Sequence, residues 1–167
     1  ILTALFGVAL ILEPAILLLA CAALTRPFTA QPMQLVAIVN HFARSLMPIG
    51  FGVWLAHYGF HFFTGFLTIV PVAQNAVLQS TGLALLGEPQ WHLGGLPESM
   101  VFPMELGFMG LGLVGSWMVA WTLAHQVAPA RPGRSFYAWA VLHLAIFAFA
   151  VWVMTQPMDM RGTFLGG

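Results

Sequence analysis

The sequence predicts an all-α integral membrane protein, built as a bundle of four transmembrane helices with a long outer loop between spans two and three. Of the 167 residues, 60% are hydrophobic and 6% are charged, and the mean hydropathy is +0.90. Four apolar runs each reach the ~20 residues that a helix needs to cross the hydrocarbon core. The runs do not alternate as barrel strands do, and a helix satisfies its own backbone groups in lipid.

The apolar runs also predict where each transmembrane span begins and ends. We expect one transmembrane domain, 1–167, whose spans cover about 2–25, 47–72, 101–124 and 136–156. The stretch 33–46 mixes apolar residues with Asn40, His41, Arg44 and Ser45. It fits an interfacial helix or a cytoplasmic extension of span two beyond a kink near Pro48, and we favour the extension.

Arginines set the predicted orientation. Arg26 and Arg44 flank the first connection, and Arg131 and Arg134 lie in the third. The second connection, about 73–100, has neither Lys nor Arg. The positive-inside rule therefore places connections one and three in the cytoplasm, and the long loop and both termini outside. The chain has no basic stripe, so we expect no nucleic-acid partner.

Span three contains four glycines at spacings of two to five residues. Such glycines allow another helix to come close, although ordinary membrane glycine frequency explains them equally well. They are Gly107, Gly110, Gly112 and Gly115.

Ionisable residues inside the spans are the candidates for function, because they are costly in lipid. Counting ~1.5 Å per residue from the span ends gives two levels. His57 and His143 share the middle to inner half of the bilayer. Glu13, His61 and Glu105 share the outer half.

Three functional interpretations compete with plain structural roles for these residues. The first is haem b, with His57 and His143 as the two axial ligands of its iron. His41 and His125 form a second candidate pair. His61 lies one turn from His57 on the same helix face. Ligation of a chlorophyll-type pigment by His57 or His143 is a variant of it.

The second is a metal site, because an i, i+4 histidine pair such as His57 and His61 is common ligand spacing, and Glu13 or Glu105 completes the set. The stretch HYGFH lacks the glutamate of a metalloprotease HExxH motif. The third is a proton path through Glu13, His61 and Glu105.

The stretches RSLMPIGFGVWLAHYGFHFFTGFLTIVPVAQ (44–74) and VMTQPMDMRGT (153–163) resemble the membrane portion of bacterial polyferredoxin-type (4Fe-4S) electron-transfer proteins. The resemblance covers about a quarter of the chain and implies a membrane anchor for iron–sulfur modules. The single cysteine, Cys21, cannot hold such a cluster, so we expect none on this chain.

The sequence therefore predicts a multi-pass protein of the bacterial inner (cytoplasmic) membrane, a non-catalytic subunit or domain of a respiratory or photosynthetic electron-transfer complex. Its expected partners are the lipid bilayer and other membrane subunits of a redox complex, including an iron–sulfur protein. The alternatives are a component that transports protons or metal ions, and a purely structural subunit of a larger membrane complex.

Overall fold

The computed structural model describes residues 2–156, except for the side chains of Ala4 and Glu98. Every regular element in this part of the chain is helical. Four helical segments are long and apolar enough to cross a membrane, as expected of a multi-pass membrane protein. They cover Leu5–Phe28, Leu35–Thr81, Ser99–Val127 and Pro132–Thr155. The predicted helical class is confirmed for the described residues, and each expected span coincides with one of these segments.

The first segment joins α1 (Leu2–Gly7), a π-helical turn (Val8–Leu12) and α2 (Glu13–Thr25). Pro14 has no backbone N–H for the carbonyl of Leu10, which lies inside the π-helical turn. The N–H of Glu13 reaches back five residues to the carbonyl of Val8. The helix accommodates its proline by widening one turn rather than by ending.

The second segment contains α3 (Leu35–Phe42), α4 (Leu46–Gly65) and α5 (Ile69–Thr81), joined by two 3₁₀ turns. The turns cover Ala43–Ser45 and Phe66–Thr68. Each contains the residue four before a proline, Pro48 or Pro71, whose carbonyl loses its usual N–H partner. Residues 35–42 are helical and lead into α4 through the irregular turn at 43–45; whether they form an interfacial helix or a cytoplasmic extension stays a prediction.

The first part of the connection predicted at 73–100 is helical. Helix α5 continues to Thr81 because 73–80 contains no Gly or Pro, and it ends where Gly82 adopts a left-handed φ of 70°. The non-helical part covers 82–97. The side chain of Gln74 holds it, since Nε2 donates to Leu86 O at 3.0 Å and Oε1 accepts from Gln90 N at 3.0 Å.

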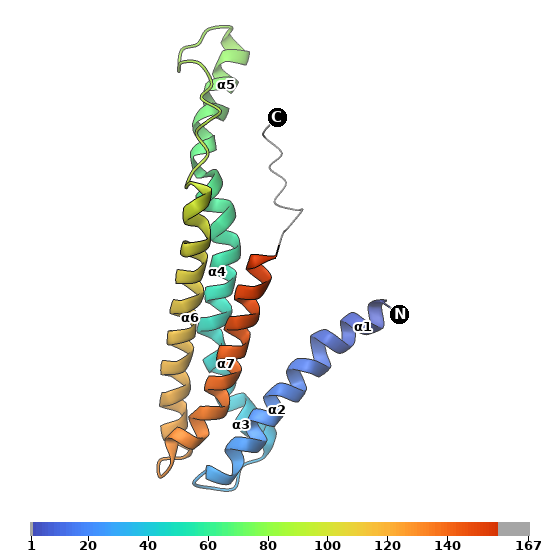
Figure 1. Cartoon of the computed structure of the whole chain (residues 1–167). Coiled ribbons are helices and arrows are strands. Elements are labelled where there is room, and N and C mark those ends of the chain that lie inside the picture. The colour runs from blue at the N-terminus through green and yellow to red at the C-terminus, as the bar shows by residue number, and fades with distance from the viewer. Residues whose placement is uncertain (1, 157–167) are drawn as a thin grey trace. The chain divides into compact units, whose positions relative to one another are not determined.

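The last two helices are α6 (Glu98–Val127) and α7 (Pro132–Thr155). The chain divides into two compact units, 1–49 with 113–167 and 50–112. In the first unit, α2 contacts α3 and α7. Figure 1 shows that the N-terminal part of the first segment diverges from α7, so only its C-terminal part joins that core.

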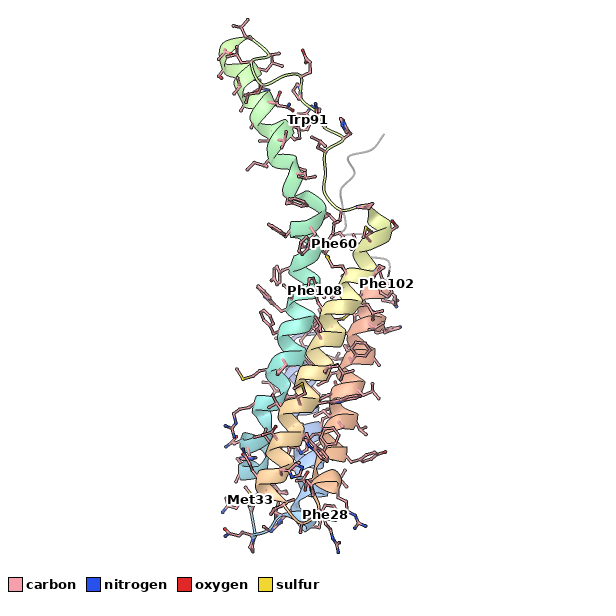
Figure 2. All side chains as sticks on the ribbon, turned by 90° about the vertical axis from the view of Figure 1, so that its left-hand side faces the viewer. Phe28, Met33, Phe60, Trp91, Phe102 and Phe108 are labelled. Carbon is pink, nitrogen blue, oxygen red and sulfur yellow. The ribbon has the colours of Figure 1, made fainter. Side chains whose placement is uncertain are left out.

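The unit 50–112 is held by close backbone approach between α4 and α6. A Cβ on Gly52 would lie 2.7 Å from Phe108 O and 3.1 Å from Gly112 Cα. Figure 2 labels Phe108, whose ring packs 6.3 Å from that of Phe63. The loop adds two backbone bonds, from Leu96 N to Phe63 O (2.8 Å) and from Leu67 N to Gly94 O (3.1 Å).

The glycines of α6 divide into two groups. Gly112 lies at the contact just described, and a Cβ on Gly115 would meet Pro48 Cβ at 3.0 Å. A Cβ on Gly107 or Gly110 would meet nothing within 4 Å. The packing seam therefore involves two of the four predicted glycines.

Candidate functional site

His143 lies on α7 with none of its surface exposed. Ser45 Oγ, in the 3₁₀ turn before α4, donates to Phe42 O at 2.6 Å and lies 3.2 Å from His143 Nε2. A hydroxyl has one proton, so Ser45 accepts from His143 and the ring carries its proton on Nε2. Nδ1 has no hydrogen-bond partner among the described residues.

One turn before His143, Trp139 fixes the same face of α7 against the first and second segments. Its ring stacks on Phe42 at 4.7 Å with an interplanar angle of 4°. Its indole N–H donates to Thr25 Oγ1 at 3.0 Å, and that hydroxyl donates to Cys21 O at 2.8 Å. His143 therefore belongs to a close-packed core with its own polar contacts.

This packing bears on His143 as a haem ligand. Ligation through Nε2 would replace the contact with Ser45, and the ring is fully enclosed by other side chains. The arrangement supports His143 as an internal hydrogen-bond partner of Ser45. Its assignment as a haem or pigment ligand stays a prediction.

His57 and His61 have the opposite surroundings. Both are exposed on α4, one turn apart, with ring centroids separated by 5.7 Å. Aromatic rings flank them, because His57 packs edge-on against Tyr58 at 5.2 Å and His61 against Phe60 at 5.1 Å. Trp54, one turn before Tyr58, is exposed as well.

The geometry of this pair restricts what it can bind. Two rings this close on one helix face can reach one metal ion as neighbouring ligands, given metal–nitrogen bonds of about 2 Å. They cannot clamp one haem iron from opposite sides, because both lie on the same side of the helix. A haem held by His57 needs its second axial ligand from another element or chain.

The two carboxyl groups predicted to complete a metal site also differ from each other. Glu105, on α6, is 1% exposed, whereas Glu13, at the start of α2, is exposed. Among the side chains that the structure describes, no three His, Cys, Asp or Glu residues lie close enough to hold a metal ion. A metal at His57 and His61 therefore requires further ligands from water or another chain.

The second predicted haem pair consists of His41 and His125. His125 is exposed and its ring packs edge-on on Trp121 at 4.8 Å. His41 is half-buried and packs edge-on on Phe42 at 5.7 Å. Within residues 2–156, no hydrogen bond or ring contact joins the two histidines.

Sequence reasoning did not assign the polar partners Thr25, Ser45 and Trp139. The only available signal was that Trp139 and His143 are one turn apart, which places them on one helix face. Residues 157–163 of the second resembling stretch lie outside the described residues. Comparison with protein-family models, curated proteins and solved structures gave no match to this chain.

Proposed function

We propose that this chain is a membrane subunit or domain of a bacterial respiratory or photosynthetic electron-transfer complex in the inner membrane, where it anchors redox partners. The observation that supports the proposal best is the pair His57 and His61, which offers two imidazoles side by side on an exposed aromatic face of a long apolar helix. The resemblance of residues 44–74 to the membrane portion of polyferredoxin-type proteins includes this pair.

His57 and His61 are the residues that would hold the cofactor, haem b or a metal ion. When bound, such a cofactor supplies one-electron chemistry within the bilayer. The chain itself contributes imidazole nitrogens at a fixed spacing and the flanking rings of Tyr58 and Phe60.

The decisive experiment is a reduced-minus-oxidised spectrum of the purified protein, together with elemental analysis. We expect an α-band of the b type or a stoichiometric transition metal. The signal should disappear in the double variant His57→Ala/His61→Ala and persist in the matched control His125→Ala, which removes another exposed histidine. A wild-type protein with neither an α-band nor a metal would refute the cofactor assignment.

A purely structural subunit is the second candidate, and His143 is the observation that favours it. Its ring contributes to packing and hydrogen bonding inside one unit. If substitution of His57, His61 and His143 by Leu leaves both complex assembly and electron flow intact, the structural role is the better description. Loss of electron flow with intact assembly would support the redox role.

A further inference from the structure

The N-terminal helix carries an exposed acidic residue inside its predicted membrane span. Every described side chain in residues 2–20 is exposed except Gly7 and Leu18, which are half-buried. Glu13 lies within this stretch and makes no hydrogen bond or ion pair with any described residue. A carboxyl group in lipid needs a hydrogen-bond donor, and within the described residues Glu13 has none.

Donors of the right kind lie on the exposed face of α4. The face carries Trp54, His57, Tyr58 and His61. Glu13 lies 13 residues before Arg26, and His57 lies 13 residues after Arg44. If both arginines mark the cytoplasmic surface, each of these groups lies about 20 Å from it. Counted from these arginines rather than from the predicted span ends, the carboxyl group and the imidazole lie at the same depth in the bilayer.

We propose that a second copy of this chain covers the N-terminal helix, with Glu13 of one copy accepting an imidazole N–H from His57 of the other. The inference rests on the proposed membrane placement. The two segments run in opposite directions across the bilayer in that topology, so matching Glu13 to His57 also places Ile16 opposite Trp54 and Ala9 opposite His61. All six side chains are exposed within one chain.

Two-fold symmetry makes the contact self-complementary. An axis along the membrane normal keeps depth unchanged, so the pair from Glu13 to His57 forms twice in one dimer. An imidazole has two nitrogens, and a ring that donates one N–H to a carboxylate keeps the other nitrogen for a metal or haem iron. Glu13 is thereby a positioning residue that orients His57 toward a cofactor.

Cross-linking between differently tagged, co-expressed copies tests the proposed register. In a Cys21→Ala background, one copy carries Ile16→Cys and the other Trp54→Cys, and a short bis-maleimide joins adjacent thiols. We expect a product that carries both tags. The matched control replaces Ile16→Cys by Ile11→Cys, which is 72% exposed but on the opposite face of the helix. The control should give no product above background.

Several results would overturn the proposal. One is a control with Ile11→Cys that cross-links as well as Ile16→Cys does, and another is no cross-linking with either. A third is a cross-linked product of monomer mass when Ile16→Cys and Trp54→Cys are on one chain. The last result would show that one chain satisfies its own Glu13. The readout does not depend on a bound cofactor, so its failure is distinct from a missing α-band.

Energetic coupling provides a second measurement. Glu13→Leu removes both copies of the contact and should weaken dimer formation in detergent about tenfold to a hundredfold, which corresponds to about 1.4 to 2.7 kcal/mol for two interhelical hydrogen bonds. His57→Leu should weaken it equally, and the double variant no further, because both remove the same contact. Glu13→Gln keeps an acceptor oxygen and should retain most of the association. Fully additive losses would contradict the pairing.

Discussion

The N-terminal segment and α7 are both apolar helices with one ionisable residue well inside, yet their surroundings are opposite. An 18-residue window has a mean hydropathy of 2.4 within the N-terminal span and of 2.0 within α7. His143 of α7 is enclosed and bonded to Ser45, whereas Glu13 is exposed without a partner among the described residues. Hydropathy therefore predicts that a helix can cross a bilayer, but not whether its polar group finds a partner in the same chain.

Side-chain size explains where the two helices meet. The buried residues of α2 are Cys21, Ala22 and Thr25. Ala138 lies opposite them on α7, and its carbonyl oxygen is 3.6 Å from Cys21 Sγ. Small residues let helix backbones approach, which is the main source of helix association in lipid. Residues 8–19 are mostly Leu, Ile and Val, and apart from Leu18, which packs against this core, they are exposed.

The largest loss of stability should follow from removing a large side chain from the core of the first unit. Trp139→Ala removes the stack on Phe42 and the bond to Thr25, and should lower the free energy of unfolding by about 3 to 5 kcal/mol. Denaturant titration in micelles, followed by circular dichroism, measures it. The controls are Trp152→Ala, 57% exposed on the same helix, and Ile11→Ala, each expected within about 0.5 kcal/mol. Comparable losses in all three would refute the contrast between the helices.

In unit 50–112, we expect the same contrast between helix positions that contact another helix and positions that do not. Gly52→Ala places a methyl group against Phe108 O and Gly112 Cα, both backbone atoms, and should cost about 1 to 3 kcal/mol in the same titration. Gly110→Ala meets nothing within 4 Å and should be neutral or stabilising by up to about 1 kcal/mol, since Ala favours helix. A neutral Gly52→Ala would show that this approach is looser than described.

A smaller loss is expected from the polar partner of His143. Ser45→Ala leaves the Nε2 proton of His143 without its acceptor and should lower the free energy of unfolding by about 1 to 2 kcal/mol. Adding His143→Leu should cost less than the two single losses combined, because both variants break one contact. Thr122→Ala, which removes an exposed hydroxyl, is the control. Strict additivity would argue against the hydrogen bond.

The smallest effect should come from Glu13. Under conditions that keep the protein monomeric, Glu13→Leu should leave the free energy of unfolding unchanged within about 0.5 kcal/mol, because no described residue binds the carboxyl group. Unfolding at high detergent-to-protein ratio measures this value. A loss as large as that of Ser45→Ala would show that Glu13 has a partner in its own chain.

The four spans could be predicted because composition and length alone decide whether a helix can cross hydrocarbon. An irregular turn also lies close to the kink predicted near Pro48. Similar turns contain the residues four before Pro14 and Pro71, which were not predicted, whereas Pro103 lies inside the regular helix α6. The end of α5 was predicted too early, because polar helix formers such as Gln74 continue a helix without raising its hydropathy.

The surroundings of the candidate site residues could not be predicted. His57 and His143 were both predicted in the middle to inner half of the bilayer, but one is exposed and the other enclosed. Helical periodicity assigns residues to a face and does not say which neighbour covers that face. That choice depends on contacts distant in sequence, such as the one from Ser45 to His143.

The helical segment Leu35–Thr81, which includes two 3₁₀ turns, has 47 residues. At 1.5 Å per residue its contour measures about 70 Å, more than twice the ~30 Å of hydrocarbon that a bilayer offers. Much of it must therefore extend into water, and the amides and hydroxyls of α5 make that end the candidate. In that placement, the polar end of α5 lies beyond the lipid headgroups.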